Sequence, residues 1–129
     1  MKSTVQTRYD LRYHFVWLPK YRKRVLQGKV AKSIEGMIRY CSEVHDWEVF
    51  DLAVESDHVH LYMGVQPRWS PSQVMKRVKG GTARKIKKMY PEFDEIYWGA
   101  GFWADGYMVK SSGVVSDKVI SRYIQKQGR

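Results

Sequence analysis

Two histidines stand two residues apart in a stretch that otherwise has the pattern of a buried strand, ESDHVHLYMGV at 55–65. Side chains of a strand alternate between its faces. The alternating apolar residues would face a core: Val59, Leu61, Met63 and Val65. His58 and His60 would then share the opposite face with Tyr62. Two neutral imidazoles on one face can bind a divalent metal ion, and a third ligand would have to come from elsewhere in the chain.

The C-terminal segment offers that ligand. Tyr123 and Gln127 are spaced to lie on one face of a helix, and Ile120 and Ile124 would form the neighbouring face that packs on the domain. A mixed nitrogen and oxygen site with open positions suits Mg²⁺ or Mn²⁺ better than structural zinc. Such a metal can polarise a phosphate oxygen. A nearby tyrosine can act as a nucleophile if its phenol, with an ordinary pKa of about 10, is helped to ionise.

Each of these features also has a structural interpretation. A pair of histidines in a strand can be incidental, and a tyrosine on an amphipathic helix usually packs. Gln127 lies near the end of the sequence, where fraying is the default. His14 and His45 are interpreted as structural or surface residues. The chemical interpretation therefore depends on these features occurring together.

The charge balance points to a polyanionic partner. The chain has 23 Lys and Arg against 13 Asp and Glu, a formal net charge of +10. Such an excess bears on partners rather than on fold, and nucleic acid is the simplest partner. Residues 76–88 contain several Lys and Arg and no acid, which fits a phosphate-binding surface or a solvated helix face.

Length and composition narrow the class of protein. The 129 residues suit one domain, so we expect a single domain over 1–129. Cys41, the one cysteine, excludes an internal disulfide and a cysteine-based zinc site. We find no apolar run of the roughly 18 residues that a membrane helix needs and no signal peptide, and therefore expect a cytoplasmic protein.

Hydrophobic periodicity gives the order of elements. Strands are predicted at 8–18, 47–55, 58–65 and 102–110, and helices at 27–45, 70–90 and 116–127. Phe50, Leu52 and Val54 would share one face of their strand, and Gly80 with Gly81 would weaken or kink the second helix. The β-α-β-β-α-β order predicts an α+β, ferredoxin-like (RRM-like) antiparallel sheet with two helices on one face and an extra C-terminal helix. The histidine face then needs another role or a partner.

Four segments together resemble one family. DHVHLYM is similar to the HUH motif, two histidines around a hydrophobic residue, and YIQKQ is similar to the matching tyrosine motif. YHFVWLPKYRKRVL and FWADGYMVKSSGVVS resemble the same proteins. That family is the small single-tyrosine HUH transposases of insertion sequences (TnpA type, IS200-like), and the similarity runs from about Tyr13 to Gln127.

The resemblance implies a mechanism residue by residue. His58, His60 and Gln127 match the metal ligands, and Tyr123 matches the nucleophile on the catalytic helix at 116–127. Family members are homodimers that bind single-stranded DNA ends folded into hairpins, form a 5′-phosphotyrosine and free a 3′-OH. Their active site is often completed in trans by the partner's last helix. The resemblance also implies action on the nucleoid.

A single-stranded DNA substrate would need phosphate and base contacts. Phosphates are held by Lys and Arg, and unpaired bases stack on aromatic side chains. The predicted phosphate contacts are Lys20, Arg22, Lys23, Arg77, Lys79 and Arg84. The candidate stacking residues, each of which could instead belong to the core, are Trp17, Tyr21, Trp69 and Trp103.

Other functions remain open at this point. A non-catalytic single-stranded nucleic-acid binder on an RRM-like sheet explains the charge and the aromatic residues, but not the histidine pair with the Tyr/Gln helix. A metal-dependent phosphohydrolase would usually recruit more Asp or His ligands than this chain offers. A domesticated relative that serves the host is a third alternative. Replacement of Tyr123 by Phe separates the transposase from the hydrolase and the binder.

Overall fold

The computed structural model describes residues 2–3, 8–93, 101–111 and 115–127. Its centre is an antiparallel four-stranded sheet in the order β4-β5-β3-β6. The strands of this sheet are β3 (Leu11–Trp17), β4 (Glu48–Glu55), β5 (His58–Val65) and β6 (Met108–Lys110). The short strands β1 (Lys2–Ser3) and β2 (Arg8–Tyr9) pair separately. This strand order confirms the ferredoxin-like prediction.

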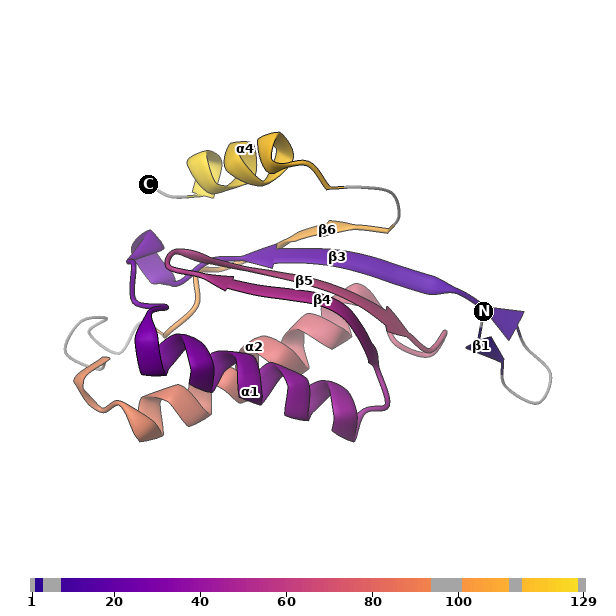
Figure 1. Cartoon of the computed structure of the whole chain (residues 1–129), viewed down its shortest axis with the longest axis horizontal. Coiled ribbons are helices and arrows are strands. Elements are labelled where there is room, and N and C mark those ends of the chain that lie inside the picture. Colours follow the sequence, from indigo (N-terminus) through magenta and orange to yellow (C-terminus); the bar gives the residue numbers. More distant parts are fainter. Residues whose placement is uncertain (1, 4–7, 94–100, 112–114, 128–129) are drawn as a thin grey trace.

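Two helices cover one face of the sheet, which we call the inner face. Helix α1 (Gly28–Val44) and helix α2 (Pro71–Met89) lie side by side beneath the strands (Figure 1). Buried and partly exposed residues alternate along the whole of β5, as its sequence predicts. Its buried residues join Phe15 and Trp17 of β3 in the main hydrophobic core: Val59, Leu61, Met63 and Val65.

The opposite face, which we call the outer face, carries helix α4 (Asp117–Gln127). Figure 1 shows α4 on the other side of the sheet from α1 and α2. It is held by a small cluster in which Val16 of β3 packs with Val115 and Ile120, and Ile124 packs against this cluster. The amphipathic pattern of the last helix therefore predicted its packing face correctly.

Helix ends follow local sequence signals. Ser70 caps α2 with a capping box, in which its hydroxyl accepts from the backbone of Gln73 and the Gln73 side chain accepts from the backbone of Ser70. The Ser116 hydroxyl accepts from the Val119 backbone at the start of α4. Helix α2 continues through Gly80 and Gly81 as one element.

The structure corrects the prediction for β4. A bulge lies between Val49 and Asp51, which pair with Met63 and Tyr62, so Phe50 is the extra residue on the bulged strand. Instead of sharing a face with Leu52 and Val54, Phe50 turns to the outer face. There its ring lies beside Tyr62 and beneath Arg12.

Two other strand predictions were too long. The first strand divides into β2 and β3, and the fourth is only β6 at its C-terminal end. Phe102 and Trp103 are buried in the main core, and the Trp103 indole donates a hydrogen bond to the Thr82 hydroxyl at 2.8 Å. This segment docks between α2 and the sheet, because the Trp103 ring also packs edge-on against Trp17 of β3.

Among the helices of the described residues, none combines the length and the apolar character that a membrane span requires.

Candidate active site

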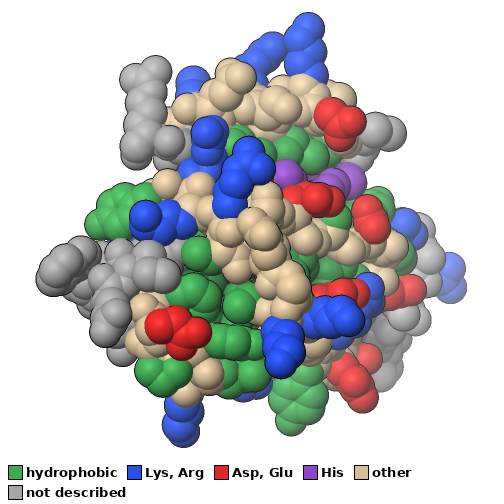
Figure 2. Space-filling model, turned by 60° about the vertical axis from the view of Figure 1, so that its left-hand side comes forward, with side chains coloured by type: hydrophobic (Ala, Val, Ile, Leu, Met, Phe, Trp, Pro, Cys, Tyr) green, Lys and Arg blue, Asp and Glu red, His purple; other side chains and the backbone are tan. Residues whose placement is uncertain are grey.

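Strand β5 positions both histidines of the predicted site on the outer face. His60 lies between Val16 of β3 and Ala53 of β4, and His58 lies opposite Glu55. Because directly paired residues of antiparallel strands project to the same face, the neighbours of the histidines follow from this register. In Figure 2 histidine side chains reach the surface just below the uppermost helix, beside acidic side chains.

Asp57 orients His58. The Nδ1 of His58 donates to Asp57 Oδ1 at 3.0 Å, and both side chains are 17% exposed. A carboxylate on one ring nitrogen fixes the tautomer and leaves the other nitrogen, Nε2, as the available ligand atom. Sequence analysis left Asp57 between two predicted strands without a role, so this contact was missed.

His14 contacts His60 from the neighbouring strand. His14 Nδ1 and His60 Nε2 share a hydrogen bond of 3.2 Å, and the His14 ring stacks on Tyr62 with centroids 4.0 Å apart. Burial lowers the pKa of His60, and the nearby His14 lowers it further. His60 is therefore kept neutral, as a metal ligand must be. Sequence analysis gave His14 no functional role, although its place on the outward face of the first strand was a usable signal.

Helix α4 carries Tyr123 over the same face of the sheet. The Tyr123 ring packs against the cluster of Val16, Val115 and Ile120, and Val16 is the cross-strand neighbour of His60. Burial raises the pKa of the Tyr123 phenol, so the phenol stays protonated without help. Gln127 is the last residue of α4, and its side chain lies outside the described residues.

Within the described part of the chain, histidine, cysteine and carboxylate side chains do not by themselves complete a metal site. Across 8–93, 101–111 and 115–126, no three such side chains are grouped so that they could hold an ion. The pair His58 and His60 fits part of a metal site, because Asp57 fixes one ring and burial keeps the other neutral. A third ligand would therefore be of another type, such as the amide of Gln127, or come from outside the described residues or from another molecule.

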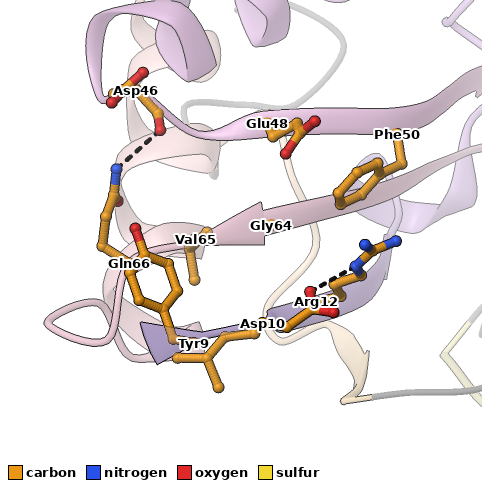
Figure 3. A pocket seen from close by; sticks show the side chains of 10 residues that line it. Tyr9, Asp10, Arg12, Asp46, Glu48, Phe50, Gly64, Val65 and Gln66 are labelled. Atoms are coloured by element: carbon orange, nitrogen blue, oxygen red, sulfur yellow. Dashed lines mark hydrogen bonds and ion pairs between the residues drawn. The ribbon is translucent and has the colours of Figure 1, made fainter. Parts of the chain in front are cut away.

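The β4 side of the outer face is acidic. Glu48, Asp51 and Glu55 lie opposite Gly64, Tyr62 and His58 of β5. At the end of the sheet away from His58 is a hollow of about 470 Å³. Figure 3 shows its lining, with the Asp10–Arg12 ion pair and the Gln66 amide donating to the Asp46 backbone oxygen. With acids in the majority among its charged side chains, this hollow does not suit a phosphate.

The predicted phosphate contacts on α2 separate into two groups. Arg77 and Arg84 are exposed and line a groove between α1 and α2 together with Lys85. Lys79 instead donates from Nζ to the backbone oxygens of Ala104 and Gly106, at 2.8 and 2.9 Å. Lys79 thus fastens the segment before β6 to α2, which leaves its ammonium less available to a phosphate than sequence analysis supposed.

The remaining predicted contacts lie just after β3. Lys20 and Arg22 bound a short 3₁₀ helix, η1 (Lys20–Arg22), and Lys23 follows it and is exposed. Lys20 lies close enough to Lys79 for its charge, after burial, to lower the pKa of Lys79, against the opposing effect of Asp105. The lining of the groove of Arg77 and Arg84 does not include Lys20, Arg22 or Lys23.

The candidate stacking residues divide by burial. Trp17 and Trp103 are buried in the main core, so they do not present a face to a base. Trp69 is partly buried and packs edge-on against Trp47. Tyr21 is 56% exposed, and on this criterion it alone among the four presents most of its ring at the surface.

The sequence matches a known family over nearly its whole length. The family model described as "Transposase IS200 like" matches residues 7–127. The chain belongs to the IS200-like transposase family. Four segments, among them DHVHLYM and YIQKQ, led sequence analysis to the same family, so that assignment is confirmed.

Relatives within the IS200-like transposases cover most of the chain. The ISDra2 transposase TnpA of Deinococcus radiodurans is 33% identical over 119 residues, which are 92% of this chain and 85% of the relative. The transposase for insertion sequence element IS200 of Salmonella typhimurium is 28% identical over 126 residues, 98% of this chain and 82% of that protein.

Solved structures agree with the fold. A crystal structure assigned to a transposase of Deinococcus radiodurans R1 has a TM-score of 0.90 at 31% identity and covers 98% of both chains. A REP-associated tyrosine transposase bound to a REP hairpin has a TM-score of 0.57 at 10% identity, over 98% of this chain and 70% of that one. The second likeness shows a shared fold.

Proposed function

We propose that this IS200-like transposase cleaves and rejoins single-stranded DNA at the ends of an insertion sequence, with Tyr123 as the nucleophile. The observation that carries the proposal is that Tyr123 of α4 lies over the outer face of the sheet, against the small cluster that contains Val16, the cross-strand neighbour of His60. A nucleophile and two potential metal ligands on one face can act on one phosphate. The same proposal includes that the protein acts on the nucleoid and that the DNA ends it binds are folded into hairpins.

The chemical step exchanges one phosphoester for another. The Tyr123 oxygen bonds to the phosphorus, the bond from phosphorus to the 3′ oxygen breaks, and that oxygen takes up a proton to become a 3′-OH. The product is a 5′-phosphotyrosine. Since the ester bond is conserved, attack by a 3′-OH on this linkage rejoins the strand and restores the tyrosine without an external energy source.

His58, His60 and Gln127 would hold a divalent metal, Mg²⁺ or Mn²⁺. When bound, the metal supplies positive charge that polarises the phosphate oxygen. The chain's own residues prepare the ligands: Asp57 accepts the Nδ1 proton of His58, and burial keeps His60 neutral. Because burial also raises the pKa of Tyr123, its proton has to pass to a base or to water as the phosphate is attacked.

The proposal includes a homodimer whose active site can be completed in trans. In the single chain, α4 packs on its own sheet through a cluster with few buried members, namely Val16, Val115 and Ile120. Few contacts would be lost if α4 of one subunit exchanged onto the sheet of the other. Because few contacts would be lost, the free-energy cost of this exchange is small, which supports the proposed completion of the site in trans.

The test is a covalent adduct. We would incubate the protein with Mn²⁺ and single-stranded hairpin oligonucleotides from the flanks of its own gene, and map any adduct by mass spectrometry. We expect an adduct on Tyr123 that is absent in Tyr123→Phe. Tyr40→Phe is the matched control, because Tyr40 is exposed on α1 and should leave the adduct unchanged.

Two results would contradict the proposal. Strand cleavage by the Tyr123→Phe variant would exclude Tyr123 as the nucleophile. Tight, salt-sensitive binding without any adduct would favour the second candidate, a single-stranded nucleic-acid-binding module. The groove between α1 and α2 is the observation that favours this second candidate, because its exposed Arg77 and Arg84 offer cations away from the proposed active site.

A further inference from the structure

Helix α4 carries a row of exposed cations that the proposed chemistry has not used. The row is Lys118, Arg122 and Lys126, each four residues from the next and all exposed. In the described ranges, no acidic side chain forms an ion pair with them. Like charges at this spacing repel one another along a helix, so the row works against helix stability unless an anion offsets it.

The row lies next to the proposed nucleophile. With about 100° of rotation per residue in an α-helix, Arg122 lies about 100° and Lys126 about 60° to one side of Tyr123. Ile120 and Ile124 lie to the other side, where they pack toward Val16. Tyr123 therefore sits at the border between the apolar stripe that holds α4 and the cationic row.

The opposite approach to the histidines is acidic. Asp51 and Glu55 of β4 lie on the outer face opposite Tyr62 and His58, and Asp57 contacts His58 directly. Figure 2 shows acidic side chains beside the histidines and Lys and Arg side chains around the uppermost helix. A polyanion that approaches along β4 meets like charge, whereas one that approaches along α4 meets opposite charge.

We infer that the row formed by Lys118, Arg122 and Lys126 is a phosphate track that holds the unpaired DNA segment beside the scissile phosphate. The row is about 12 Å long at a rise of 1.5 Å per residue, the length of a few stacked nucleotides at roughly 3.4 Å each. The acidic β4 side directs the strand to α4. This inference rests on the proposed function and adds the path by which the DNA reaches Tyr123.

The test compares two triple variants in a Tyr123→Phe background, where binding is measured without cleavage. The track variant is Lys118→Gln, Arg122→Gln and Lys126→Gln, and glutamine is a good helix former. The control is Lys29→Gln, Lys32→Gln and Arg39→Gln, which removes the same charge from exposed positions on α1. Circular dichroism checks that both variants keep their helices.

The probes are a hairpin oligonucleotide from the flank of the gene, with and without its single-stranded extension. Fluorescence anisotropy measures the binding constant K of each probe at a series of salt concentrations. Each phosphate contact to a single strand contributes about 0.7 to the slope of log K against log salt. We expect the track variant to reduce the slope by roughly 2 for the extended probe and to leave the bare hairpin unchanged. The control should retain both slopes.

Equal slopes for the track and control variants on the extended probe would overturn the inference. The same three substitutions in a chain with Tyr123 intact distinguish a failure of this inference from a failure of the proposed function. Adduct formation at the unaltered rate together with an unchanged slope would reject the track and leave Tyr123 as the nucleophile. A reduced slope in a chain that never forms an adduct would support the track and reject the proposed cleavage.

Discussion

The two faces of the sheet are packed very differently. The inner face joins α1 and α2 through a large core that includes Phe15, Trp17 and Leu61. The outer face joins α4 through Val16, Val115 and Ile120, with partly exposed neighbours. Burial of apolar surface is the main stabilising term, so α1, α2 and the sheet form a firm platform and α4 is held weakly. The proposed metal ligands stand on the platform, and the proposed nucleophile is on the weakly held helix.

The largest effect should come from the inner face. Leu61→Ala removes a fully buried side chain from the centre of β5, and we expect the free energy of unfolding to fall by about 2–5 kcal/mol. Chemical denaturation followed by circular dichroism measures it. A loss well below this range would show that the inner core is not the main source of stability.

A smaller global effect should come from the outer face. Ile120→Ala removes a side chain at the edge of the smaller cluster, so we expect a loss of about 1 kcal/mol in the free energy of unfolding. Amides of α4 should exchange faster than those of α1 and α2 already in the original chain, and faster still in the variant, because α4 opens locally without the rest of the fold. Hydrogen exchange with mass spectrometry measures the rates in all three helices. Exchange in α4 of the original chain as slow as in α1 and α2 would contradict the separation of the two faces.

The next effect concerns pH. The pKa of His60 in the folded chain lies below its ordinary value of 6.5, first because of burial, so the unfolded chain binds more protons just below that pH. The contribution of neutral His60 to the free energy of unfolding is therefore fully present above pH 6.5. It is lost as the pH falls toward the pKa that His60 has in the folded chain. Denaturation midpoints of the original chain and His60→Gln, measured from pH 8 downward, should converge as the pH falls. Parallel curves would exclude His60 as the source.

The smallest effect should come from His14. His14→Phe keeps a ring that can stack on Tyr62. It removes the neighbour that, after burial, does most to lower the pKa of His60. We expect a slight rise in the pKa of His60, followed by NMR titration of its ring. Tyr62→Phe, which leaves His14 in place, is the control. A pKa of His60 that falls in His14→Phe would show that the contact acts in the opposite sense.

Much of the platform could be predicted from the sequence because the signals are local. Alternation along β5 places His58 and His60 on one face whatever the strand pairs with. Ser70 caps α2 within its own turn. The strand order follows from the order of the elements and the handedness of their connections. The motifs around His58, His60 and Tyr123 were sufficient to indicate the family.

Only the tertiary structure decided the surroundings of the site. His14 contacts His60 because β3 pairs with β5 in one register, and no local pattern encodes that register. The bulge turns Phe50 outward. Lys79 donates hydrogen bonds to the segment before β6 because that segment docks on α2. Local geometry fixes the direction in which a side chain points, whereas long-range pairing fixes what it meets. The sequence by itself therefore determined the residues of the proposed chemistry and put Asp57 next to His58, whereas the fold decided the burial and the neighbour that hold His60 neutral.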